Sequence, residues 1–150
     1  MNIEEKLAEM GLILPAAPKP IAAYVPAVRS GNMLFVAGQL PVRDGKLLAT
    51  GPVTNTEEAA AASRQCALNG LAILKEQVGG DWSRVVRVVR LGVFVQSADG
   101  WPDQPKVANG ASELMVQLFG EAGRHARAAV GVNALPLNAT VEIEFVFEVR

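Results

Sequence analysis

The sequence predicts an α+β fold in which two helices cover one face of a mixed β-sheet. Residues 140–149 alternate between apolar and charged side chains, as a strand with one buried face does. Two longer segments, one after residue 54 and one over residues 104–119, repeat apolar side chains at helical spacing. The expected order is strand, strand, helix, strand, helix, strand, strand, and two helices can cover only one face of such a sheet.

The N-terminal segment is expected to stand apart from the body of the protein. Its first ten residues form an acidic, amphipathic pattern that predicts a short helix. Pro15, Pro18 and Pro20 follow, and proline continues neither a helix nor a strand ladder. We therefore expect an N-terminal extension over residues 1–20 and one domain over residues 21–150.

A hairpin is expected next. Residues 24–28 and 33–37 are apolar runs joined by the polar segment 29–32. The chain then reaches a turn centred on Asp44 and Gly45.

Helix boundaries follow from capping residues. Thr54 to Glu57 fits a capping box, in which a hydroxyl and a carboxylate satisfy free amide donors at a helix start. The first helix should end at Gly79 and Gly80, and the second at Gly120, because glycine commonly terminates helices.

The strands predict both a core face and an uncovered face. Residues 85–95 are rich in β-branched side chains. In residues 140–149 the apolar side chains share one face, whereas Glu142, Glu144 and Glu148 share the other. Residues 33–37 and 93–95 are apolar on both faces, so the side without helices would expose a large hydrophobic patch. We therefore expect a homo-oligomer with sites near its interfaces.

The composition excludes several classes of protein. The 150 residues fit one domain, and the formal charge of -1 gives no net attraction to nucleic acid or to an acidic membrane. Cys66 is the single cysteine, which excludes an intrachain disulfide, and with the single His125 it offers no zinc site. Cys66 is expected to be a small buried apolar residue.

No signal peptide or membrane-spanning run is recognisable, which predicts a cytoplasmic protein.

Arg127 and Glu142 are the most informative pair of charges. The arginine is expected to close one strand and the carboxylate to open the next, so hairpin pairing would place both at one end of the sheet. Such a pair could bind a small carboxylate substrate and a water. Taken alone, however, each is more typical of a solvated surface group, and Glu144 and Glu148 share the face of Glu142.

Several segments together resemble the RidA family, also known as the YjgF or endoribonuclease L-PSP family. They are Tyr24-Val25-Pro26-Ala27-Val28, Gly31-Asn32-Met33, Gly38-Gln39-Leu40-Pro41-Val42, Ala61-Ala62-Ser63-Arg64-Gln65, Val93-Phe94-Val95 and the stretch from Arg127 through Leu135-Pro136 to Glu144. The resemblance implies a chorismate mutase-like fold and a homotrimer with a central barrel and intersubunit clefts. It also implies hydrolysis of reactive 2-imino and enamino acids to 2-oxo acids and ammonia, with no metal and no organic cofactor.

The resemblance also implies roles for individual residues. Arg127 aligns with the arginine that binds the substrate carboxylate, and Glu142 with the acidic residue of the family. Tyr24 matches a cleft tyrosine and Gly31 a cleft glycine. The planar guanidinium of Arg127 can hold a carboxylate bidentately while Glu142 accepts a proton from water. The backbone amide of Ala129, expected on the strand face of Arg127, can help to hold the carboxylate.

The chain departs from the family pattern at several positions. Ala129 stands where the family often has cysteine, and His125-Ala126 replaces an apolar residue and a proline. His125 shares the expected face of Arg127, but the family requires no histidine there. Trp101 can line the cleft or pack on the second helix, and Tyr24 can be a core ring instead of a cleft residue. These departures leave the choice of imino acid open.

Two other functions remain possible from the sequence. One is a non-catalytic trimer that binds a small carboxylate and acts as a regulator. The other is an endoribonuclease or translation inhibitor, for which RNA contacts normally need a basic face with stacking aromatic rings. Arg84, Arg87 and Arg90 form the single basic cluster, Arg87 is expected to point away from the other two, and 5% of the residues are aromatic. Nucleic acid binding is therefore disfavoured.

Overall fold

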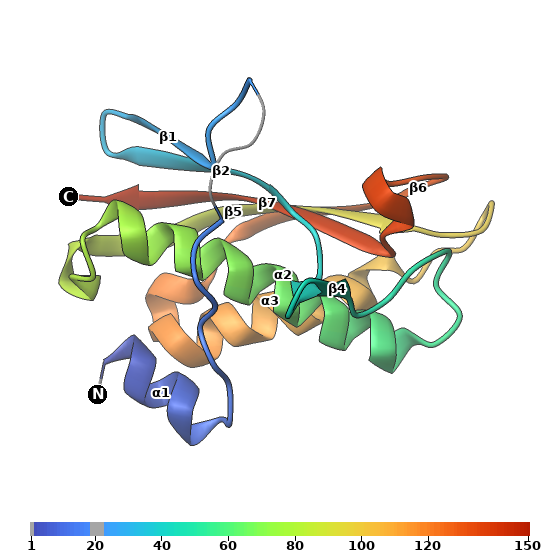
Figure 1. Cartoon of the computed structure of the whole chain (residues 1–150), viewed down its shortest axis with the longest axis horizontal. Coiled ribbons are helices and arrows are strands. Elements are labelled where there is room, and N and C mark those ends of the chain that lie inside the picture. The colour runs from blue at the N-terminus through green and yellow to red at the C-terminus, as the bar shows by residue number, and fades with distance from the viewer. Residues whose placement is uncertain (1, 19–22) are drawn as a thin grey trace.

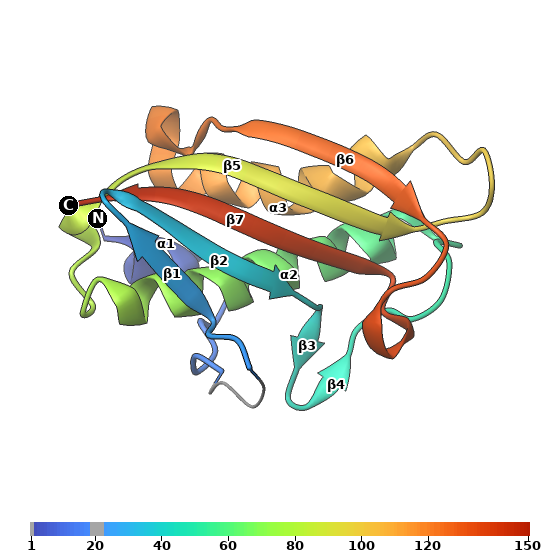
Figure 2. The ribbon, with the colours of Figure 1, turned by 90° about the horizontal axis from the view of Figure 1, so that it is seen from above.

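A five-stranded mixed sheet forms the centre of the computed structural model, which describes residues 2–18 and 23–150 (Figure 1). The strand order is β1 (Ala27–Ser30), β2 (Met33–Gln39), β7 (Val141–Val149), β5 (Val85–Gln96) and β6 (Ala126–Val132). Strands β5 and β6 are parallel and the other neighbours are antiparallel. The short strands β3 (Val42–Arg43) and β4 (Lys46–Leu47) form a separate hairpin (Figure 2). The predicted α+β class with a mixed sheet is confirmed.

Two helices lie on one face of this sheet, as predicted (Figure 1). Helix α2 (Thr56–Gln77) and helix α3 (Gln104–Phe119) also pack on each other. Their backbones approach closely at Gly110, where a Cβ atom would lie 2.0 Å from the carbonyl oxygen of Ala60. Only glycine fits this crossing without moving a helix.

The helix boundaries match the sequence prediction except at the start of α2. Helix α3 has the predicted bounds, and α2 is followed by Gly79 and Gly80, both with positive φ. The capping box predicted at Thr54 is wrong. Asn55 is the N-cap, because its side chain accepts the amide of Glu58 at 3.0 Å.

The core lies between the helices and the sheet. Every second residue of β7, from Val141 to Val149, is buried. Phe145 and Phe147 stack with ring centroids 5.8 Å apart, and burial of one such side chain contributes about 1.5–3 kcal/mol. Cys66 on α2 is fully buried in this core, as predicted.

The N-terminal segment packs against the body. Helix α1 (Ile3–Glu9) buries Ile3 and Leu7, and the Lys6 ammonium donates to the carbonyl oxygen of Leu118 at 2.8 Å. The chain then runs back across α2 towards β1 and β2 (Figure 1). Pro20, one of the three prolines expected to separate this segment, lies outside the described residues.

The hairpin of β1 and β2 is confirmed, but its turn is shorter than predicted. Ser30 pairs with Met33, so Gly31 and Asn32 alone form the turn. Gly31 has a φ of +59°, which glycine adopts without strain. Strand β1 begins at Ala27, so Tyr24 precedes the strand.

The sheet face opposite the helices carries exposed apolar side chains. Val28, Phe35 and Val130 are 54%, 48% and 45% exposed. The predicted uncovered apolar face is therefore present, and the homo-oligomer that would cover it stays a prediction.

The same face carries charges of both signs. The sequence predicted that Arg87 would point away from Arg90, and this is wrong. A register shift between Val88 and Arg90 places an extra residue in β5, so both arginines lie on the uncovered face. Arg90 lies 3.9 Å from Glu144, which leaves the face mixed in charge, not basic.

None of the described helices combines the length and the apolar character needed to cross a bilayer. Likewise, residues 2–18 and 23–150 contain no group of three His, Cys, Asp or Glu side chains that could hold a metal ion.

Candidate functional site

Glu142 lies on the uncovered face near the start of β7. It pairs in register with Phe94 of β5, and its carboxylate lies over Gly38 of β2. A Cβ atom at Gly38 would lie 2.9 Å from the Glu142 carboxyl carbon, so the glycine makes room for the acid. Partial burial, with a smaller contribution from the charge of Glu144, raises the pKa of Glu142. A carboxyl group with a raised pKa is better suited to proton transfer near neutral pH.

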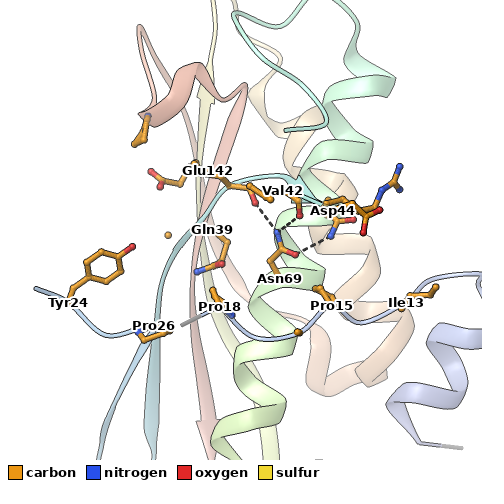
Figure 3. Close-up of a pocket in the computed structure, with 16 residues that line it drawn as sticks. Ile13, Pro15, Pro18, Tyr24, Pro26, Gln39, Val42, Asp44, Asn69 and Glu142 are labelled. Carbon is orange, nitrogen blue, oxygen red and sulfur yellow. Dashed lines mark hydrogen bonds between the residues drawn. The ribbon is translucent and has the colours of Figure 1, made fainter. Parts of the chain in front are cut away.

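A pocket of about 640 Å³ extends from Glu142 along the sheet edge (Figure 3). Tyr24 and Glu142 lie at one end, and Asp44 of the β3–β4 turn lies at the other. The N-terminal segment forms one wall through Pro15 and Pro18. The extension therefore lines the pocket that contains Glu142.

Two buried amides fix the wall between β2 and β3. The Gln65 amide donates to Asn69 Oδ1 at 3.0 Å. Asn69 Nδ2 in turn donates to the carbonyl oxygens of Leu40 and Val42, at 2.9 and 3.0 Å. The sequence analysis quoted Gln65 in a motif without assigning it to the site, and it missed Asn69, although two amides one turn apart on a largely apolar helix are an unusual pattern.

Arg127 lies on the opposite side of the sheet from Glu142. It pairs in register with Leu91 of β5, whose side chain is in the core, so Arg127 points to the helix side. Its Nη1 donates to Asn109 Oδ1 at 2.9 Å and to Ser112 Oγ at 3.1 Å, both on α3. Within the described part of the chain, no acceptor pairs with Nε or Nη2 of Arg127. That edge of the guanidinium is therefore available to a bidentate ligand.

The predicted hairpin between the strands of Arg127 and Glu142 is wrong. Strand β5 lies between β6 and β7, and it pairs parallel with β6 (Figure 2). Arg127 also lies near the start of its strand, not at its end. Because the two residues project from opposite faces, one protomer cannot bring both to the same small ligand.

Tyr24 and Gly31, the other predicted cleft residues, have different positions. Tyr24 is 60% exposed and lines the pocket, so its aromatic ring is not part of the hydrophobic core. Gly31 lies in the β1–β2 turn, beside the pair formed by Met33 and Glu148 at the far end of the sheet. The glycine next to Glu142 is Gly38, which the sequence analysis quoted in a motif but did not assign to the site.

The remaining predicted residues lie around β6. Ala129 pairs with the buried Val93, so it shares the helix-side face of Arg127. His125 approaches Ser112 of α3, with Nε2 2.9 Å from Oγ. Trp101 lines a separate cavity of about 360 Å³ beyond the ends of β5 and β6, away from Glu142.

Comparison with known proteins places this chain in a family. Residues 14–149 match the family model described as Endoribonuclease L-PSP. The chain belongs to this family. The RidA/YjgF resemblance seen in the sequence is thereby confirmed.

Three relatives of this L-PSP family member are informative. Protein TCP17 of Trypanosoma cruzi is 45% identical over 99% of this chain and 95% of its own length. A 2-iminobutanoate/2-iminopropanoate deaminase of Dermatophagoides farinae is 32% identical, over 87% of this chain and 88% of its own. The crystal structure of Atu1372 from Agrobacterium tumefaciens superposes with a TM-score of 0.93 at 46% identity, covering 99% of this chain and 92% of that one.

Proposed function

We propose that this protein hydrolyses 2-imino and enamino acids to 2-oxo acids and ammonia. The observation that carries the proposal is Glu142, a half-buried carboxylate with a raised pKa at the end of a pocket that also contains Tyr24. The named activity of the Dermatophagoides relative supports this reaction class.

The site is proposed to form between two protomers. Arg127 and Glu142 project from opposite faces of one sheet, so a ligand that contacts both needs Arg127 of one protomer and Glu142 of its partner. The exposed apolar residues of the uncovered face give a second reason for association. A homotrimer, with three equivalent sites and the uncovered faces forming an inner barrel, is the assembly that the family resemblance implies.

In the proposed site the arginine binds and orients the substrate. Its free Nε and Nη2 edge would hold the carboxylate by two parallel hydrogen bonds, and the backbone amide of Ala129, two residues further along the edge strand, would add a third. Fixing the carboxylate holds the neighbouring imine carbon in one position for attack.

Glu142 is proposed to act on the attacking water. It takes one proton as the water oxygen forms a bond to the imine carbon, and it passes that proton to the imine nitrogen, giving a carbinolamine. The proton of the carbinolamine hydroxyl then moves through Glu142 to the nitrogen, the carbon–nitrogen bond breaks, ammonia leaves, and the oxygen becomes the ketone of the 2-oxo acid. The Tyr24 hydroxyl, which points into the pocket in Figure 3, would donate a hydrogen bond to the intermediate or close the cleft.

A coupled assay tests this proposal. A threonine dehydratase generates the imine in place, and its loss is followed with and without purified protein. Wild type should accelerate the loss and Arg127→Ala should not, because the substrate carboxylate has lost its anchor. Equal acceleration by both proteins would show that the site is wrong, and no acceleration by wild type would refute the activity.

Non-catalytic carboxylate binding is the alternative that the same residues support. Glu142→Gln separates the two, because hydrolysis needs a base whereas binding through Arg127 does not. A variant that binds 2-oxobutanoate normally but no longer hydrolyses the imine favours the enzyme. RNA cleavage gains no support from the mixed charge of the uncovered face.

A further inference from the structure

A chain of polar contacts connects His125 to Arg127 through helix α3. His125 Nδ1 lies 2.7 Å from the carbonyl oxygen of Gly123, and Nε2 lies 2.9 Å from Ser112 Oγ. Ser112 Oγ also accepts from Arg127 Nη1 at 3.1 Å, and Asn109 Oδ1 accepts from the same nitrogen. The hydrolysis proposed above uses none of the three residues Asn109, Ser112 and His125.

The direction of each hydrogen bond in this chain follows from its two ends. A carbonyl oxygen can only accept, so the His125 proton must be on Nδ1. In the neutral ring Nε2 is then an acceptor, and the Ser112 hydroxyl must donate to it. The lone pairs of Ser112 consequently face Arg127, which can only donate.

The environment of His125 favours this neutral form. Burial lowers the pKa of His125, and the neighbouring positive charge of Arg127 lowers it further, against an opposing contribution from the Gly123 carbonyl. The ring is thereby kept in the state in which Nε2 accepts.

The contacts hold one nitrogen of the guanidinium and leave the others free. Both acceptors on α3 bind Nη1, and these two hydrogen bonds set the plane and the direction of the guanidinium group. The edge formed by Nε and Nη2 remains open. A long arginine side chain on an edge strand would otherwise lose considerable rotamer freedom when it binds a ligand. Fixing it beforehand reduces that cost.

We propose that Ser112, oriented by His125, is a positioning residue that aims Arg127 at the substrate carboxylate. This inference rests on the proposed function, because it concerns the same arginine. It predicts that Ser112 affects the binding of substrate much more than the chemical step, since it contacts no reacting atom.

The experiment compares two pairs of variants in the coupled imine assay. Ser112→Ala and His125→Phe each remove one member of the chain, whereas Ser112→Thr keeps the hydroxyl and His125→Gln keeps an acceptor near the place of Nε2. The first two should raise KM about tenfold with kcat changed less than twofold, and the second two should stay near wild type. Gln117→Ala, on an exposed position of the same helix, is the control.

A second measurement does not depend on turnover. Binding of 2-oxobutanoate, followed by calorimetry, should weaken by the same factor in Ser112→Ala and in His125→Phe. The double variant should be no worse than either single one, because both changes break one chain of contacts. If Ser112→Ala does not fold, the two His125 variants carry the test alone.

The outcomes separate this inference from the proposed function. Unchanged KM and product affinity in Ser112→Ala and His125→Phe, with Arg127→Ala inactive, would overturn the positioning role and leave the function standing. A fall in kcat without a rise in KM would overturn it too. Full activity of Arg127→Ala would instead remove the function on which the inference rests.

Discussion

Gly38→Ala tests the position of Glu142 without changing the acid itself. The backbone of Gly38 is outside the left-handed region, so alanine fits it without strain. The added Cβ atom would lie 2.9 Å from the Glu142 carboxyl carbon and from Oε2, whereas ordinary contacts begin near 3.4 Å. The carboxylate must therefore retreat by at least about half an ångström, and a shift of about 1 Å at a reacting group can cost about a hundredfold in rate.

We expect kcat in the coupled imine assay to fall between about tenfold and a hundredfold. The melting temperature should change little, because the nearest atoms belong to the free end of one flexible side chain. Gly92→Ala is the matched control, since its Cβ atom would contact Arg90 and Glu144 on the same face, and not Glu142. Wild-type kcat in Gly38→Ala, or an equal loss in Gly92→Ala, would refute the reasoning.

Three further predictions concern stability and reactivity. The pKa of Glu142 is raised in the folded state, so ionising this carboxyl group costs more in the folded than in the unfolded protein, and the folded state loses stability as the pH rises above the ordinary carboxyl range. Glu142→Gln, which cannot ionise, should therefore melt at a higher temperature than wild type at pH 8. At pH 4 the difference should vanish. Gly110→Ala should lower the free energy of unfolding by about 1–3 kcal/mol in urea titrations, since its Cβ atom would overlap the Ala60 carbonyl; an unchanged midpoint contradicts this. Burial raises the pKa of the Cys66 thiol, so it should react with a disulfide reagent in urea but not in buffer.

The fold could largely be predicted from the sequence because the local sequence patterns agree with the way the elements pack in the structure. The alternation in β7 and the glycines after α2 and α3 mark elements whose buried faces and ends leave little choice. Small errors came from competing local signals, as at the start of α2, where Asn55 caps the helix in place of Thr54.

The arrangement of the site was harder to predict because it depends on long-range pairing. Nothing in the residues between Arg127 and Glu142 indicates that β5 inserts between their strands, which converts a supposed hairpin into residues on opposite faces. The bulge in β5 that turns Arg87 to the uncovered face is similarly invisible in a simple alternation. The sequence supplied the candidate residues, and only the register of the strands fixed where their side chains point.

The most direct test of the two-protomer site uses two inactive variants together. Arg127→Ala and Glu142→Gln chains are co-expressed with different tags, and the oligomers that carry both tags are purified and assayed. If each site takes Arg127 from one protomer and Glu142 from its partner, every trimer that carries both tags has one intact site in three, so about a third of the wild-type activity returns. That recovery of imine hydrolysis is the predicted result. Mixed oligomers that form but remain as inactive as either variant alone would contradict the intersubunit site.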